Sequence, residues 1–228
     1  MSLISLSLDQ FVDSALSSNG QRFDGEQRRT KILAAAIQEC SEKGFAAASM
    51  ASIAKRARVS TASLYRDFGI REKLLDDTTV FAAPMISAEL VAPVDETRPR
   101  ERMVALLIRQ CQVFDHPHAS WLFRAYVGGV LDDSSQMRQL GQMARTNIEA
   151  FWRSELSSLQ ERGLLQIPQM DEAINFVLGT VYRRTLLAML LFGANDVAEP
   201  DVETAAQSAV NWLFAQFETQ PSSIGSVQ

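Results

Sequence analysis

The chain has 228 residues, of which 46% are hydrophobic and 21% charged, and its formal net charge is −5. This length can bury a sizeable core, and the composition excludes a disordered, fibrous or disulfide-stapled protein. We expect Cys40 and Cys111 to be buried thiols, and with only His116 and His118 besides them the chain has too few ligands for zinc at a usual spacing. The sequence therefore predicts neither a metal nor another cofactor.

No stretch of the sequence resembles an export signal or a membrane span. The apolar start, residues 1–16, lacks a basic leader and carries Asp9 and Asp13 where the apolar core of a signal peptide would run. The longest apolar run, residues 186–194, is far shorter than the roughly 18 residues that a bilayer requires. We predict a cytoplasmic protein with no membrane partner.

Charge is divided unevenly along the chain. Residues 22–74 contain eleven Lys and Arg against six acidic residues, a net charge of +5, whereas the remainder carries −10. A basic head on an acidic body is the pattern of a small nucleic-acid-binding module attached to a larger one. An ordinary solvated surface would explain the charges equally well, so the local sequence motif is needed to distinguish it from a nucleic-acid-binding module.

Hydrophobic residues recur with helical spacing throughout, and no stretch alternates as a strand does. The sequence predicts an all-α fold of about nine helices, at residues 26–42, 50–57, 61–67, 71–90, 99–114, 118–131, 135–162, 171–192 and 201–217. Four regions follow from this pattern: a flexible extension (1–25), a head (26–75), a helical bundle (76–220) and a disordered tail (221–228).

The head contains two very short helices joined by a tight turn. Ser49 and Ser60 are good N-caps for them, because a serine hydroxyl can accept from a free backbone N–H at a helix start. Leu64 and Phe68 are expected to point inward, which leaves the opposite face of the second short helix open to solvent. Such a pair predicts a helix-turn-helix, whose second helix fits the DNA major groove.

At this point the sequence resembles the tetracycline-repressor-like (TetR) family of bacterial transcriptional regulators. The matching residues, at the family's spacing, are Ser49, Ile53, Ala54, Ala57, Val59, Ser60, Leu64, Tyr65, Phe68, Arg71, Glu72, Leu74 and Leu75. They lie within residues 49–75, and beyond the head the likeness is limited to length and helical pattern.

The resemblance implies which residues touch DNA. Ser49, Tyr65 and Arg71 correspond to family positions that contact phosphates, and the start of the second short helix reads base edges. Arg66 could bind guanine with two hydrogen bonds, and Ala62 could touch a thymine methyl group. The predicted DNA-binding set is Ser49, Ser60, Thr61, Ala62, Ser63, Tyr65, Arg66, Arg71 and Lys73. Lys55 and Arg56 are expected to be solvated.

Three positions depart from the family pattern. Arg58 replaces the usual turn glycine, where a positive φ would strain a side chain. Asp67 brings a carboxylate next to the expected phosphate backbone, and it would repel DNA unless Arg66, Arg71 or Lys73 compensates. Gly69 and its neighbour Ile70 replace the commoner Lys-Ser pair and remove one positive charge.

For the bundle, the resemblance implies an effector pocket and a dimer seam. The predicted pocket residues are Met85, Met103, Gln110, Phe114, Trp121, Phe123, Tyr126, Met143, Asn147, Phe151, Phe176 and Arg183. The predicted seam residues are Val177, Val181, Arg184, Ala205, Ala209, Trp212 and Leu213. Each of these residues, taken singly, could equally well be an ordinary residue of the protein core. Pro84 within residues 71–90 favours a kink in the helix that would couple effector to head.

The resulting hypothesis is a homodimeric regulator, by default a repressor, that binds a palindromic DNA operator and is released by a lipophilic or aromatic effector. Its place would be the bacterial cytoplasm, in association with the nucleoid. The absence of a glycine-rich phosphate loop or a nucleophile motif argues against an enzyme. The alternative is a helical interaction module that has lost specific DNA binding. Operator sequence, effector and regulated genes cannot be read from the residues.

Overall fold

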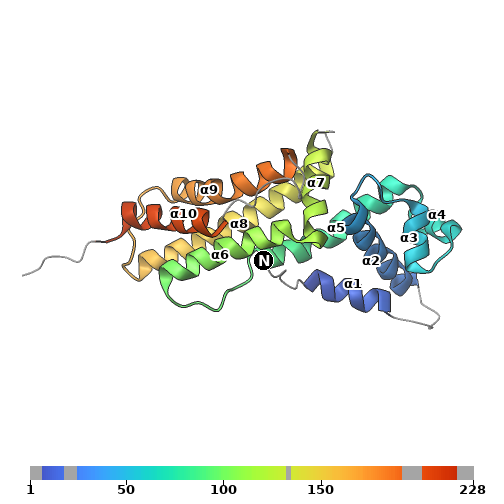
Figure 1. The fold of residues 1–228 in the computed structure, drawn as a ribbon, viewed down its shortest axis with the longest axis horizontal. Helices are drawn as coiled ribbons and strands as arrows, with labels where there is room; N and C mark the ends of the chain where they lie inside the picture. Colours follow the sequence, from blue (N-terminus) through green and yellow to red (C-terminus); the bar gives the residue numbers. More distant parts are fainter. Residues whose placement is uncertain (1–6, 18–24, 132–134, 192–201, 220–228) are drawn as a thin grey trace, which may run out of the picture. The chain divides into compact units, whose positions relative to one another are not determined.

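The computed structural model describes residues 7–17, 25–131, 135–191 and 202–219 (Figure 1). Within these ranges the chain forms α-helices and no strand beyond an isolated bridge between Leu165 and Glu218, so the predicted all-α fold is confirmed. None of the helices found in these ranges is both long and apolar enough to traverse a bilayer.

Ten helices are described in these ranges. They are α1 (Ser7–Ser17), α2 (Gly25–Lys43), α3 (Met50–Ala57), α4 (Thr61–Phe68), α5 (Arg71–Leu90), α6 (Pro99–Asp115), α7 (Pro117–Leu131), α8 (Ser135–Glu161), α9 (Met170–Leu191) and α10 (Val202–Phe217). The nine predicted helices match α2 to α10 closely. Helix α5 runs through Pro84, which lies inside it with an exposed side chain.

Helix α1 corrects the prediction that residues 1–25 form a flexible extension. Leu8 and Val12 are fully buried, and the ring of Phe11 lies 5.0 Å from that of Phe81 on α5. The backbone N–H of Ser7 donates to Glu89 at 2.8 Å. The sequence analysis missed α1 because this amphipathic helix is short and a Ser- and Gly-rich stretch follows it. Residues 18–24 and the predicted tail at 221–228 lie outside the described ranges.

The contacts divide the chain into two units. The first comprises residues 1–92 and 112–145, and the second comprises residues 93–111 and 146–228. The predicted head boundary after residue 75 does not coincide with this division, because α5 and α7 pack against α2 in the first unit.

Helix α2 is the centre of the first unit and packs against α1, α3, α5 and α7. Ile32 and Ile37 have no exposed surface, so the helix buries most of its circumference. Cys40 is also buried, and this burial raises the pKa of its thiol to about 12, which keeps it unreactive. Cys40 and Cys111 are both buried thiols, as predicted.

The second unit combines an apolar helix pair with a few buried polar links. Helices α9 and α10 pack against each other. Between α6 and α8, Arg102 forms a fork with Glu155 at 2.9 and 3.0 Å. The indole N–H of Trp152 donates to Gln110 at 3.1 Å in a buried position. These bonds satisfy polar atoms that burial would otherwise penalise.

Candidate nucleic-acid interface

Helix α3 is fixed at both ends by local hydrogen bonds. Ser49 and Ser52 form a reciprocal capping box at its start, so the Ser49 hydroxyl is engaged in capping the helix. At its end Arg58 is left-handed (φ 58°, ψ 42°), and the N–H of Val59 bonds to Ala54 at 3.0 Å. This is a Schellman ending with arginine at the position that glycine usually occupies, as the sequence indicated, and it carries a conformational cost.

Helix α4 begins directly after this turn. The hydroxyl of Ser60 accepts from the backbone N–H of Ser63 at 3.0 Å, which confirms Ser60 as the N-cap. The helix ends at Gly69, whose φ of 77° is unfavourable for a side chain and whose N–H bonds to Tyr65 at 2.8 Å. The departure at residue 69 is thus explained by backbone geometry.

The two sides of α4 have opposite character. Leu64 and Phe68 are buried, as predicted. On the other side lie four exposed residues that we call the reading face: Thr61, Ala62, Tyr65 and Arg66. Tyr65 is 52% exposed, which is unusual for a large aromatic residue, so it is not part of the core. Ser63 is half-buried beside this face.

Asp67 is neutralised by a residue that the sequence analysis did not consider. Arg28 on α2 donates to both carboxylate oxygens of Asp67, at 2.9 and 3.2 Å, and Arg66 adds a weaker contact at 3.3 Å. The Asp67 side chain is only 17% exposed. The carboxylate therefore ties α4 to α2, and its charge is compensated within the protein.

Arg71 is held by the chain itself. Its guanidinium donates to the carbonyl oxygens of Phe45, Ala46 and Ala48 at 2.5, 3.0 and 2.7 Å. These carbonyls belong to the loop between α2 and α3, directly before the cap at Ser49. Arg71 thus holds the start of α3 in place. The predicted phosphate contact would have to be made by this same guanidinium group.

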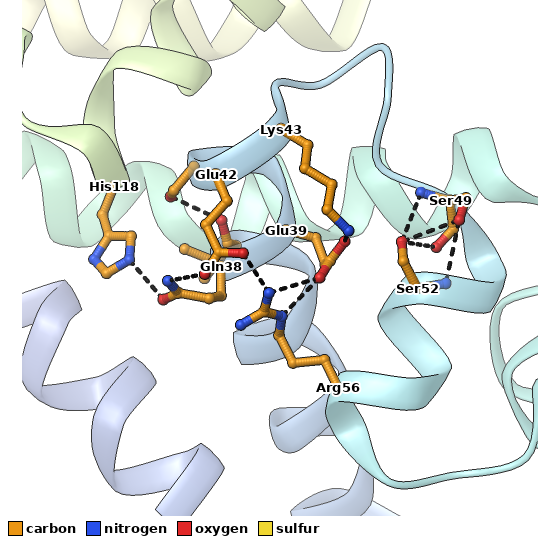
Figure 2. A network of polar contacts seen from close by, with 10 residues as sticks. Gln38, Glu39, Glu42, Lys43, Ser49, Ser52, Arg56 and His118 are labelled. Atoms are coloured by element: carbon orange, nitrogen blue, oxygen red, sulfur yellow. Dashed lines mark hydrogen bonds and ion pairs between the residues drawn. The ribbon is translucent and has the colours of Figure 1, made fainter.

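Helices α2 and α3 are joined by a carboxylate clamp (Figure 2). Glu39 accepts from Lys43 at 2.7 Å and from Arg56 at 2.8 Å, and Arg56 also bonds to Glu42. Burial acts to raise the pKa of Glu39, but the hydrogen bonds from Lys43, Arg56 and Ser52 outweigh it and lower the pKa to about 2. The expectation that Arg56 is merely solvated is wrong, whereas Lys55 is exposed as predicted.

Lys73 belongs to a smaller exposed cluster. Its ammonium group donates to Asp77 one turn along α5 at 2.6 Å, and Arg29 of α2 donates to the same carboxylate at 2.5 Å. Lys73 remains 59% exposed, so it adds positive charge to the surface while pairing locally.

Two short capped helices joined by a tight turn, with one exposed face and a framework that holds them on a third helix, define a helix-turn-helix protein. A sequence model described as "Bacterial regulatory proteins, tetR family" matches residues 32–78. Over 91 residues the chain is 31% identical to the HTH-type transcriptional regulator HbdR of Aromatoleum sp. (strain CIB), a match that spans 40% of each protein.

Solved structures extend the likeness over most of the chain. A putative TetR-family transcriptional regulator from Mesorhizobium loti superposes with a TM-score of 0.68 and 20% identity, over 87% of this chain and all of that one. A TetR regulator from Agrobacterium tumefaciens gives 0.67 and 21%, over 85% of this chain and 95% of that one. Residues 32–78 thus match the tetR family of bacterial regulatory proteins, and the solved structures share the fold of most of the chain.

The predicted effector-pocket residues are divided between the two units. The first unit contains Met85, Phe114, Trp121, Phe123 and Met143, and the second contains Met103, Gln110, Asn147, Phe151, Phe176 and Arg183. Phe114 and Phe123 pack at 4.3 Å, whereas Met143 is 59% exposed. The side chain of Tyr126 lies outside the described part of the structure. Helix α8 carries an open depression of about 420 Å³ lined by Thr146, Glu149, Ala150, Arg153, Ser154 and Ser157, none of which was predicted.

The predicted dimer residues fall into two groups. Val177, Ala205, Ala209 and Leu213 are buried within the chain itself. Trp212 is half-buried and stacks on Phe176 with ring centroids 3.7 Å apart, and Phe176 is 36% exposed. The side chains of Val181 and Arg184 are outside the described residues. An interface on α9 and α10 would therefore rest on the Phe176–Trp212 pair rather than on the buried stripe.

Proposed function

We propose that this chain is a DNA-binding transcriptional regulator that inserts α4 into the major groove. The observation that carries the proposal is the reading face: four adjacent exposed residues on a capped helix whose opposite side is fixed in the core. Arg66 supplies five N–H donors on a side chain that is 63% exposed, which suits two hydrogen bonds to guanine. Ala62 offers a methyl group, and Thr61 a hydroxyl.

Contacts to phosphate would fix the register of α4 on the duplex. The hydroxyl of Tyr65 belongs to an exposed side chain, so it can reach a phosphate without disturbing the core. Ser49 and Ser60 would act mainly by holding the helix starts in place, since both hydroxyls cap their helices. Arg71 and Lys73 add positive charge near this surface, and Arg28 removes the repulsion expected from Asp67.

A dimer on α9 and α10 completes the proposal. Two copies related by a twofold axis would present two α4 helices to a palindromic operator, with half-sites about one helical turn apart. The stacked Phe176–Trp212 pair supports this assignment, because a partly exposed pair of large rings is more stable when a second surface covers it. Phe176→Ala combined with Trp212→Ala should shift the chain toward monomer in analytical ultracentrifugation.

The proposal includes regulation by a small-molecule effector. Buried aromatic residues in both units, together with the Gln110–Trp152 bond, support an apolar ligand with few polar anchors. Release from DNA requires the effector to bind the DNA-free conformation more tightly, so operator and effector must weaken each other by the same factor. Repression is the simplest outcome of a dimer bound over a promoter.

Selection of bound fragments from random duplex DNA tests the proposal. We expect a palindromic sequence, bound with an affinity that falls steeply with salt, because phosphate contacts release counterions. Tyr65→Phe should weaken binding to all sequences alike. Recovery of no preferred sequence and no salt-dependent binding would favour the helical interaction module instead.

A further inference from the structure

Asp9, His116 and His118 form a cluster that joins α1 to the start of α7, within the first unit. One carboxylate oxygen of Asp9 lies 2.5 Å from Nδ1 of His118, and the other lies 3.2 Å from Nε2 of His116. Each residue contributes one atom to a group whose members all lie within 4.8 Å of one another. Residues more than a hundred positions apart thus converge on one point.

The cluster is largely enclosed. His116 is 5% exposed, and the side chains of His118 and Asp9 are 13% and 20% exposed. Leu8 and Val12 on the same helix as Asp9 are fully buried, so α1 is seated by apolar contacts on either side of the carboxylate. The Asp9 side chain is therefore carried by a packed element, not by a loose terminus.

His118 is oriented by a second layer of hydrogen bonds (Figure 2). Its Nε2 lies 2.9 Å from Oε1 of Gln38. The amide of Gln38 donates through Nε2 to Glu42 at 2.8 Å, which fixes Oε1 toward the imidazole ring. Nε2 of His118 accordingly carries the proton and donates, and this leaves Nδ1 directed at Asp9. A histidine held in this way by a fixed acceptor is typical of metal ligands.

We propose that Asp9, His116 and His118 bind one divalent transition-metal ion, with Zn²⁺ as the best match. Two imidazole nitrogens and one carboxylate oxygen form a donor set that zinc uses in three-ligand sites, with water as the fourth ligand. The ion would lie between the Asp9 carboxylate and the two ring nitrogens that face it, and it would tie α1 to α7. The spacing of the two histidines gave no sign of the site, because the third ligand is far away in the sequence.

One feature limits the affinity. Nδ1 of His116 accepts the backbone N–H of His118 at 3.2 Å, whereas a metal on Nε2 requires the proton to sit on Nδ1. This hydrogen bond has to open when the ion binds. His116 is therefore the weaker imidazole ligand, and we expect its replacement to cost less affinity than that of His118.

The full chain without a histidine tag allows a clean test, because its two histidines are both in the cluster. After chelation and dialysis, Co²⁺ should bind at one ion per chain with the visible absorption of a four-coordinate site, and Zn²⁺ should displace it. Asp9→Asn and His118→Gln should each weaken binding at least tenfold. Asp13→Asn, one turn along α1, is the matched control and should bind as the unmodified chain does.

Gln38→Leu separates ligation from simple packing. Loss of the Oε1 acceptor should weaken Co²⁺ binding roughly 10- to 100-fold while α1 remains seated. Circular dichroism of each variant reports whether the helices persist, and NMR reports whether Co²⁺ broadens the signals of both imidazole rings. The proposal is overturned if no ion binds, if Asp9→Asn and His118→Gln bind Co²⁺ as well as the control does, or if neither ring responds. None of these readouts involves DNA, so they are independent of the proposed regulatory function.

Discussion

Arginine serves two different purposes in the head: on the reading face of α4 it is exposed to solvent, and between the helices it forms hydrogen bonds that hold them together. Arg66 is 63% exposed, and it approaches the Asp67 carboxylate at 3.3 Å, a weak ion-pair contact. Arg28, Arg56 and Arg71 are half-buried and hydrogen-bonded to carboxylates or carbonyls; with Asp67 and Glu39 they form what we call the polar frame. The comparison shows that basic charge in the head is divided between holding the helices and meeting a partner. Mutations in the two groups should therefore separate stability from DNA affinity.

The largest effect on stability is expected at Glu39. Because its folded-state pKa is lowered from 4.5 to about 2, its contribution is fully present above about pH 4.5 and is lost as pH falls through about 2. Glu39→Gln should lower the free energy of unfolding by about 3 kcal/mol at pH 7. Urea unfolding at pH 7 and at pH 2 to 3 measures this, and the difference between variant and unmodified chain should shrink at the acidic end. Glu42→Gln, at an exposed partner of the same arginine, is the control and should cost under about 1 kcal/mol.

The largest effect on DNA affinity is expected at Arg66. Arg66→Ala should weaken binding to the selected operator roughly 10- to 100-fold, because a two-pronged contact to guanine is lost. Its unfolding free energy should stay within about 0.5 kcal/mol, as for other exposed sites. Lys55→Ala, an exposed cation on α3, should change affinity far less. If the two variants lost the same DNA affinity, Arg66 would contribute only its positive charge and no specific contact to a base.

Arg28 lies between the two groups, since it belongs to the frame and neutralises a charge next to the reading face. Arg28→Ala should cost about 1 kcal/mol of stability and weaken binding to all DNA sequences several-fold, because the Asp67 carboxylate then keeps only the weaker contact with Arg66. Adding Asp67→Asn should restore affinity while stability stays low. Fluorescence anisotropy with the four chains of this double-mutant cycle checks the coupling, and additive losses would show that Asp67 does not face the phosphates.

The smallest effect concerns the turn between α3 and α4. Arg58→Gly should stabilise the chain by about 1 kcal/mol, because glycine adopts the left-handed conformation without the cost that a Cβ imposes. Arg58→Ala removes the same charge and keeps the Cβ, so it should give no comparable gain. Thermal unfolding of both variants distinguishes relief of strain from removal of charge.

The sequence predicted the helices well and the polar frame poorly. Caps such as Ser49 and Ser60, together with the buried positions Leu64 and Phe68, are local signals, and the structure confirms them. The pairs Arg28–Asp67 and Glu39–Arg56 join residues 39 and 17 positions apart, and no local pattern indicates them. Such partners become visible only when the packing of the helices is known.

Helix α1 and the effector residues show two further limits. The apolar positions of α1 cover barely three turns, and they take on meaning only against α2 and α5. Large apolar residues such as Met143 and Phe114 look alike in sequence, yet one is exposed and the other buried. Composition cannot distinguish a core residue from one that lines a pocket.

The most direct test of the account is the base preference of Arg66→Ala. Affinities of the unmodified chain and of the variant are measured for the selected operator and for every single base-pair change within one half-site. We predict that the variant loses discrimination at one guanine position and keeps it at the others. A profile that is weakened uniformly, with no position singled out, would contradict the claim that α4 reads bases through its exposed face.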